Sequence, residues 1–132
     1  MADLTQTAGN VQLMAAGAVQ VVQAGEAVTQ GMPVYVTSSK YYQAQNTSAK
    51  DDVKGIALTP AAADEYFVLV SSGKIDLGAT LTVGTIYALS DTAGAVRPET
   101  DNGSGDYVTL LGVATAADTL ELNLIATGIA KP

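Results

Sequence analysis

Apolar and polar residues alternate with a period of two in the segments that hold most of the large hydrophobic residues of this chain. In 120–125, leucine at every second position alternates with Glu121, Asn123 and Ile125. In 66–71, both alternating sets are largely apolar. Alternation predicts a β-strand with one face in the core, whereas a strand that is apolar on both faces belongs in the middle of a sheet or under a neighbouring subunit. Glycines separate these segments and leave few places for a helix, so the predicted class is all-β.

The landmarks of one half of the chain recur in the same order in the other half. Each half has a G-x5-G segment (25–31 and 78–84), a short strand with a tyrosine (34–36 and 86–89), a variable polar loop (37–52 and 91–106), a Gly-Ile-Ala or Gly-Val-Ala strand (55–57 and 112–114), and an alternating strand that ends in glycine (66–73 and 120–128). We therefore predict one β domain over 25–132, with repeat one at about 25–73 and repeat two at about 78–128. Because units of ~50 residues bury too little surface to be stable alone, we expect the repeats to share one core. The expected architecture is a small β-barrel or a two-sheet sandwich with pseudo-twofold symmetry.

Residues 1–24 lie outside the duplication and form a largely apolar segment in which Asp3 is the only charged side chain. Their large apolar side chains include Leu4, Val11, Leu13, Met14 and Val19. An apolar segment that belongs to neither repeat needs a surface to lie on, which this core, a symmetry mate or another protein can provide. We predict an extended N-terminal arm; the alternative is a first edge strand of the same fold.

Composition removes most classes of enzyme. The 132 residues include no cysteine, histidine or tryptophan. Because histidine and cysteine supply most neutral-pH acid–base chemistry, thiol nucleophiles and zinc sites, we expect no enzymatic activity and no catalytic, cofactor-binding or metal-binding residue. Thirteen acidic residues against six basic ones give a net charge of −7, which opposes binding to nucleic acid or to an anionic membrane. Only 14% of the residues are charged, so part of the surface is expected to be covered by another molecule.

Acidic residues are the only remaining candidates for chemistry. The carboxylate pairs at 51–52 and 64–65 are adjacent in sequence, and a strand would point the two members of each pair to opposite faces. We interpret them as solvated charges. The loop at 101–106 invites a calcium interpretation, but its spacing departs from that of calcium loops. A flexible turn is the simpler interpretation.

Three residues outside the N-terminal segment are candidates for contact with a partner. Tyr41 and Tyr42 open a variable loop, where tyrosine supplies contact area; the alternative is a strand-edge pair with one ring on each face. Arg97 is the only arginine and suits a bidentate contact. The predicted partner-binding residues are Leu4, Val11, Leu13, Met14, Val19, Tyr41, Tyr42 and Arg97.

The duplicated pattern over 25–128 resembles that of small bacteriophage virion proteins of the head decoration, or capsid cement, class. The resemblance implies a non-enzymatic β-rich protein that binds the major capsid protein on the outer surface of an assembled shell. Such proteins commonly act as homotrimers and frequently use a terminal arm, here residues 1–24. They bridge neighbouring capsid subunits and thereby stabilise the shell. The Gly-Ile-Ala and Gly-Val-Ala modules also resemble segments of phage tail and fibre proteins, which is the alternative function.

The expected location is the outer capsid surface of a virion, after synthesis in the host cytoplasm. The first seven residues contain no basic side chain, and the apolar stretch 13–22 is interrupted by Gln20. We therefore predict no signal peptide and no membrane span. A carbohydrate-processing enzyme domain is a lesser alternative, weakened by the scarcity of aromatic residues that could stack on sugar rings.

Overall fold

Two antiparallel sheets make up the part of the chain that the structure describes. The computed structural model describes residues 3–4, 6, 8–14, 17–47 and 49–132. The six-stranded sheet has the order β1 (Gln12–Leu13), β7 (Gly73–Asp76), β11 (Thr119–Ala130), β10 (Tyr107–Ala116), β8 (Ile86–Leu89) and β9 (Val96–Pro98). The five-stranded sheet has the order β2 (Val19–Gln23), β6 (Tyr66–Val70), β5 (Gly55–Ala57), β3 (Pro33–Thr37) and β4 (Lys40–Gln43). Two short 3-10 helices, η1 (Ala8–Asn10) and η2 (Glu99–Asp101), complete the described elements.

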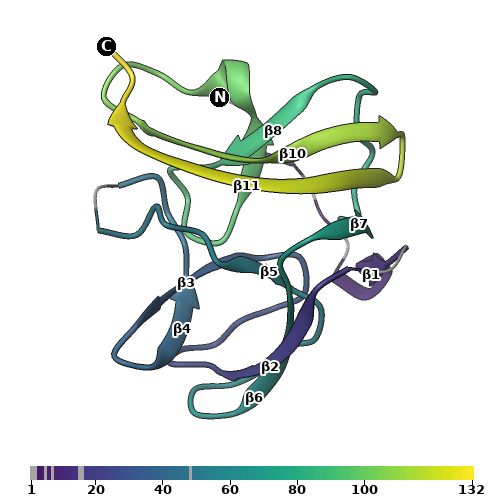
Figure 1. Ribbon diagram of the computed structural model, residues 1–132, viewed down its shortest axis with the longest axis vertical. Helices are drawn as coiled ribbons and strands as arrows, with labels where there is room; N and C mark the ends of the chain where they lie inside the picture. The colour runs from purple at the N-terminus through teal and green to yellow at the C-terminus, as the bar shows by residue number, and fades with distance from the viewer. Residues whose placement is uncertain (1–2, 5, 7, 15–16, 48) are drawn as a thin grey trace.

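The sheets stack as a sandwich, with the six-stranded sheet above the five-stranded one in the view of Figure 1. An isolated bridge between Ala24 and Tyr41 links the chain just after β2 to β4, and the five-stranded sheet does not close further into a barrel. The all-β prediction and the sandwich alternative are therefore confirmed.

The internal duplication is visible in the strand order. The sheet order β2-β6-β5-β3-β4 recurs as β7-β11-β10-β8-β9, with β1 added outside β7. Backbone hydrogen bonds recur at equivalent places in each repeat. The Gly31 N–H donates to the Ala57 carbonyl at 2.8 Å, and the Gly84 N–H donates to the Ala114 carbonyl at 2.8 Å. The repeats thus match strand by strand, and the structural unit begins at β2, earlier than the predicted boundary at residue 25.

The described residues form two hydrophobic clusters: the repeats share the larger one, as expected, but the smaller one belongs to the first repeat alone. The smaller cluster lies within the first repeat and consists of Ala24, Val28, Val34, Ala57, Ala61, Phe67 and Leu69. The larger cluster joins the interior of the second repeat to the other face of the five-stranded sheet, which contributes Ile56 and Val70. Because β5 and β6 are apolar on both faces, this sheet can be the middle layer between two cores.

The glycine of each Gly-Ile-Ala or Gly-Val-Ala strand has the same steric function in both repeats. A β-carbon on Gly55 would overlap with the backbone carbonyl oxygen of Val70, and one on Gly112 would overlap with that of Glu121. Backbone atoms in a paired strand cannot move aside as a flexible side chain can. The repeated glycine therefore allows neighbouring strands to approach closely.

We expect Gly112→Ala to lower the free energy of unfolding by about 1–3 kcal/mol, because the added methyl group must push β10 and β11 apart. Urea unfolding followed by circular dichroism measures this loss. Gly9→Ala is the matched control, since a β-carbon there meets nothing within 4 Å, and it should leave the midpoint unchanged. Equal midpoints for the two variants would contradict the steric interpretation of Gly112.

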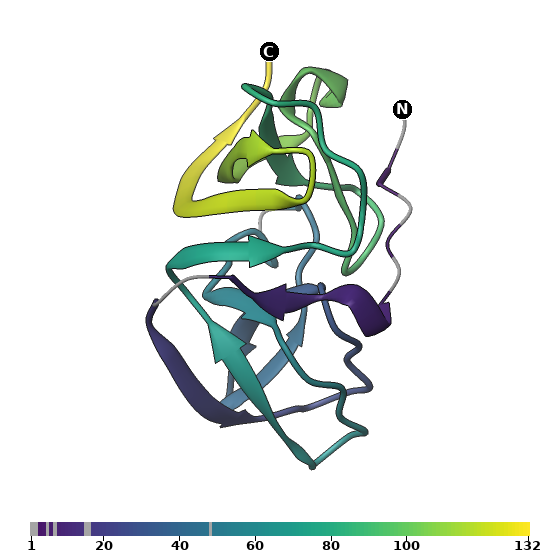
Figure 2. The ribbon, with the colours of Figure 1, turned by 90° about the vertical axis from the view of Figure 1, so that its right-hand side faces the viewer.

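The segment predicted as an N-terminal arm lies along the edges of both sheets of its own chain. Gln12 pairs with Asp76 and Leu13 with Ile75 on β7, and residues 19–23 pair with 70–66 on β6. We call residues 12–14 and 17–23 the N-terminal strap; Figure 2 shows its two strands on the side that faces the viewer. The part from Val19 to Gln23 is thus an edge strand, the alternative to a free arm, because β6 offers it a continuous row of backbone partners.

The two predicted variable loops contain regular structure. Residues 37–52 include β4, which forms a hairpin with β3 through a turn at Ser38 and Ser39, both with positive φ. Residues 91–106 include β9 and η2. The polar composition of these segments did not indicate β4 and β9, because a short edge strand needs only a few apolar residues.

Candidate functional site

The most distinctive surface of the protein is a charge-free band along the N-terminal strap. No charged residue occurs from Leu4 to Gly25, although the chain has thirteen acidic and six basic residues. Within this run, the large exposed apolar side chains are Leu13, Met14, Val19 and Val21, which we define as the charge-free band. Val19 is 50% exposed and Val21 is 67% exposed. Exposed apolar residues that gather on one strip mark sites of contact with other molecules.

The β2 half of the band continues onto β6. Val19 pairs with Val70, Val21 with Val68 and Gln23 with Tyr66, so these residues share one face of the five-stranded sheet. Val70 is fully buried beneath the second repeat, whereas Tyr66 at the other end of β6 is exposed. The apolar face therefore extends from the core to the solvent without an intervening charge.

Three of the predicted partner-binding residues, Leu13, Met14 and Val19, lie on this band. Two others point elsewhere. Leu4 packs against the larger cluster, with its N–H donating to the Val96 carbonyl at 2.8 Å, and Val11 is almost fully buried. The structure therefore gives Leu4 and Val11 a role in holding the N-terminal segment to this chain.

Tyr41 and Tyr42 lie on opposite faces of β4 and are both partly buried. The Tyr41 ring meets Phe67 edge-on, with ring centroids 6.3 Å apart, and belongs to the smaller cluster. The Tyr42 ring packs against Tyr35, with centroids 5.9 Å apart. The pair thus has the geometry of a strand-edge pair with one ring on each face, the alternative to a loop contact.

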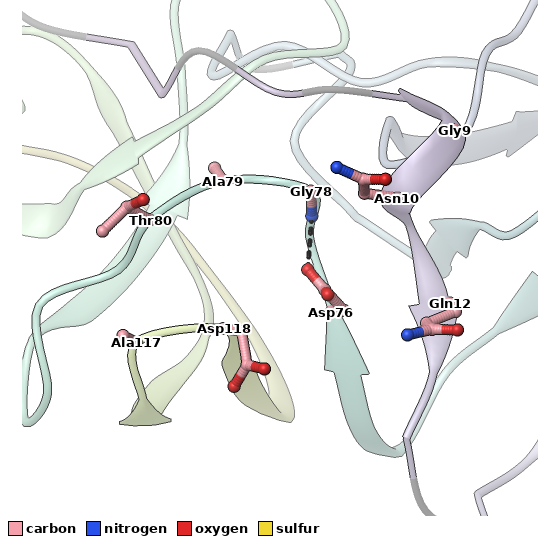
Figure 3. A pocket seen from close by; sticks show the side chains of 9 residues that line it. All are labelled: Gly9, Asn10, Gln12, Asp76, Gly78, Ala79, Thr80, Ala117 and Asp118. Carbon is pink, nitrogen blue, oxygen red and sulfur yellow. Dashed lines mark hydrogen bonds between the residues drawn. The ribbon is translucent and has the colours of Figure 1, made fainter.

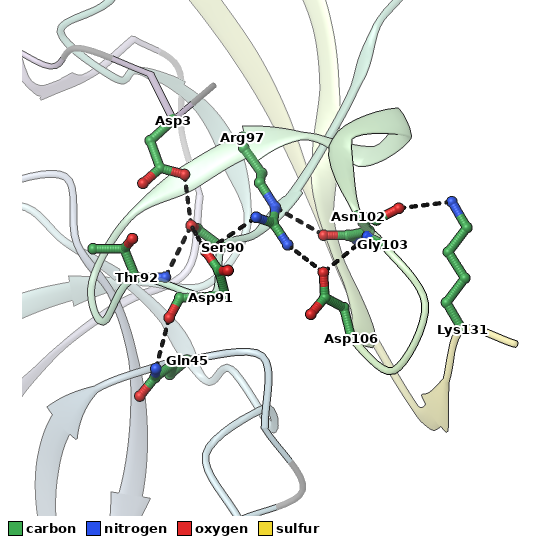
Figure 4. A network of polar contacts seen from close by, with 10 residues as sticks. All are labelled: Asp3, Gln45, Ser90, Asp91, Thr92, Arg97, Asn102, Gly103, Asp106 and Lys131. Atoms are coloured by element: carbon green, nitrogen blue, oxygen red, sulfur yellow. Dashed lines mark hydrogen bonds and ion pairs between the residues drawn. The ribbon is translucent and has the colours of Figure 1, made fainter. Parts of the chain in front are cut away.

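Arg97 is fully buried, with 0% of its side chain exposed, so it cannot reach a partner at the surface. Its Nε donates to Asn102 Oδ1 at 2.9 Å, and two guanidinium nitrogens reach Asp91 at 3.1 Å and Asp106 at 2.7 Å. Figure 4 shows these acceptors arranged around the guanidinium. The expected bidentate contact is replaced by an internal one, because residues 99–106 fold back over β9.

The same network extends to both ends of the described chain. The hydroxyl of Ser90 donates to Asp3 at 2.6 Å, and Lys131 Nζ donates to the Asn102 carbonyl at 2.9 Å (Figure 4). Asp106 also accepts the Gly103 N–H, so this carboxylate of the 101–106 loop is already engaged. Sequence reasoning missed the buried Ser90 and Asn102 and the half-exposed Asp91, since polar residues in a loop carry no local signal for a shared hydrogen-bond network.

A polar cavity of about 780 Å³ opens beside η1 and β1. Its lining includes Asp76 and Asp118, which Figure 3 shows on separate elements and pointing in different directions. Asp76 Oδ1 accepts the Gly78 N–H at 2.8 Å, and Asp118 accepts the Thr119 hydroxyl at 2.9 Å. The lining has no aromatic side chain that could stack on a sugar ring. Acid–base catalysis needs carboxyl groups that converge on one substrate atom, and this pair does not provide that arrangement.

Two further properties hold for the described residues. They contain no group of three or more histidine, cysteine, aspartate or glutamate side chains placed to hold a metal ion. None of their helices is long and apolar enough to cross a membrane.

A surface charge pair occurs at Lys40, whose Nζ donates to Asp64 Oδ1 at 2.6 Å; this hydrogen bond and the charge of Asp64 raise the pKa of Lys40.

Comparison with known proteins gives no family for this chain, so a functional interpretation rests on its fold and its surface. No protein-family model matches the sequence, and no curated protein is significantly similar to it.

Proposed function

We propose that this protein is a structural component of a phage virion that binds the outer surface of the assembled capsid and stabilises it by bridging subunits of the major capsid protein. The observation that carries the proposal is the charge-free band, which spans the edges of both sheets and exposes Leu13, Met14, Val19 and Val21. A chain with net charge −7 that keeps one strip free of charge has a surface suited to burial against protein.

The two ends of the band lie on different sheets, which favours a bridging role. Leu13 lies on β1, an edge strand of the six-stranded sheet, and Met14 follows it, whereas Val19 and Val21 lie on β2 in the five-stranded sheet. Each copy would bury a modest area, and many copies on one shell would add their contributions. The acidic balance of the rest of the surface fits the exterior of a shell better than its DNA-filled interior.

We expect Met14→Glu to weaken binding to expanded, undecorated capsids by about tenfold or more, because the new carboxylate would be buried in the contact without a cationic partner. Co-sedimentation with capsids over a range of protein concentrations measures the dissociation constant and the saturating stoichiometry. Val83→Glu is the matched control, since Val83 is equally apolar and well exposed but lies outside the band. This control should bind as the unaltered chain does.

Failure of the unaltered chain to pellet with capsids at a stoichiometry proportional to the shell would overturn the proposal. Binding to tails or fibres in a few copies per virion would instead support the alternative of a tail module. Equal weakening by Met14→Glu and Val83→Glu would show that general charge, and not the band, controls binding.

A further inference from the structure

The outer face of the six-stranded sheet, on the side away from the five-stranded sheet, carries an apolar patch. Val113 of β10 pairs with Ile86 of β8, and Leu110 of β10 pairs with Ile125 of β11. Residues that pair across neighbouring strands share one face of the sheet. Ile86 is 44% exposed and Ile125 is 45% exposed, and the other two side chains are partly exposed. We call these four residues the outer-face patch.

The neighbouring side chains on the same three strands point the other way. Tyr87 of β8, Leu111 of β10 and Leu122 of β11 are buried in the larger hydrophobic cluster. Since successive residues of a strand point to opposite faces, Ile86 and Leu110, which precede Tyr87 and Leu111, lie on the outer face. In Figure 1 this face is the upper side of the six-stranded sheet. The outer-face patch therefore extends over three adjacent strands on the side that the five-stranded sheet does not cover.

The equivalent face of the first repeat is already a packing surface. Ile56 pairs with Val70 in the first repeat as Val113 pairs with Glu121 in the second, so Ile56 and Val113 occupy equivalent positions. Ile56 is fully buried in the cluster that joins the repeats, whereas Val113 stays partly exposed. Within the described part of the chain, no second layer of this kind covers the outer-face patch. The same face of the repeat unit is thus packed against a β-layer in the first repeat and left open in the second.

Charge favours a second copy of this chain as the occupant of the patch. Two copies, each with net charge −7, repel one another over most of their surfaces. Strands β8, β10 and β11 contain one charged residue, Glu121, which pairs with Lys74 on β7. One charge of each sign therefore borders the patch, and two outer faces can meet without a net charge between them. An apolar patch with balanced charges at its border is complementary to itself.

We propose that two copies of the protein associate face to face through the outer-face patch, related by a twofold axis, so that their six-stranded sheets stack on one another. Sheets that pack in this way interdigitate the side chains of their facing surfaces. A contact of one patch with itself is isologous and closes at two copies. Val19 and Val21 lie in the other sheet and stay uncovered in such a dimer. The association does not depend on capsid binding, and it differs from the trimer implied by the resemblance to decoration proteins.

Sedimentation equilibrium of the full chain over a range of concentrations tests the proposal. The unaltered chain should approach twice the chain mass of 13.4 kDa. Ile125→Lys should raise the dimer dissociation constant at least tenfold, because its ammonium group would be buried in an apolar contact. The added positive charge reduces the general repulsion between two acidic copies, so such a loss must arise at the patch. Val21→Lys, which places the same charge on an exposed valine of the other sheet, should dimerise as the unaltered chain does.

Hydroxyl-radical footprinting of the unaltered chain supplies a test that needs no variant. The side chains of Ile86 and Ile125 should react less at high protein concentration than after dilution, while Met14, outside the patch, should keep its reactivity. A monomer at all concentrations, a trimer, a dimer in which both isoleucines stay reactive, or equal weakening by Ile125→Lys and Val21→Lys would overturn the proposal. Capsid binding by a protein that is monomeric would leave the proposed function standing and remove only this contact.

Discussion

Replacing Arg97 with alanine is expected to lower the free energy of unfolding by about 2–4 kcal/mol, since the change empties the space of a fully buried side chain and removes the donor of the buried Asn102 oxygen and of the largely covered Asp106 carboxylate. The Asp91 carboxylate, whose side chain is 47% exposed, can be hydrated instead and adds little to the loss. The guanidinium is fully buried and bonds to Asn102, Asp91 and Asp106. Three acceptors in separate positions match the planar fork of arginine. Arg97→Lys should therefore recover only part of the loss, because a single ammonium group cannot reach all three.

Urea unfolding of the two Arg97 variants measures these losses. Lys54→Ala is the control, since Lys54 Nζ lies 3.1 Å from Asp52 in an exposed ion pair. An exposed pair of this kind contributes roughly 0–1 kcal/mol. A loss at Arg97→Ala no larger than that at Lys54→Ala would mean that the network around Arg97 does not stabilise the fold.

Replacing Val70 with glutamate should lower the free energy of unfolding by about 3 kcal/mol or more, because a carboxylate would enter the larger hydrophobic cluster without a partner. Val70 is fully buried and pairs with Ile56 on β5. At the equivalent place in the second repeat, Glu121 pairs with Val113 on β10 and is exposed. Val70 packs onto the second repeat, whereas Glu121 faces solvent.

Glu121→Val is the matched control for Val70→Glu, because the two variants exchange the residues of equivalent positions. We expect its effect on stability to stay within about 0.5 kcal/mol, as is usual for exposed sites. Thermal and urea unfolding of both variants would measure the difference. Comparable losses in the two variants would show that the repeats do not differ in burial at this position.

The duplication and the all-β class could be predicted from the sequence, because both rest on local patterns. Period-two alternation specifies a strand and its apolar face wherever the strand lies. The paired glycines at 55 and 112 recur because each repeat needs the same close approach of two strands, a requirement that reappears with every copy of the unit. The double-sided apolar pattern of 66–71 also predicted that β6 would be covered on both sides.

The candidate site was only partly predictable. Leu13, Met14 and Val19 were expected to contact a partner, and the structure places them at the surface, but Leu4, Val11 and Arg97 turn inward. A lone arginine in a polar stretch has the same local sequence whether it faces a partner or is buried within its own chain. Its burial depends on Asp91, Asn102 and Asp106 meeting around it, which no short stretch of sequence specifies.

By itself, the sequence determined that the chain would form strands, that the strands would come in two matching sets, and that the run from Leu4 to Gly25 would carry no charge. The tertiary structure alone decided that this first part runs along β6 and β7, that the five-stranded sheet lies between two cores, and that Arg97 is internal. The physical reason is that side-chain pattern selects the conformation of a strand and its buried face. The choice of neighbouring strand rests on backbone hydrogen bonds that every residue can make, so only the packing of the whole chain selects it.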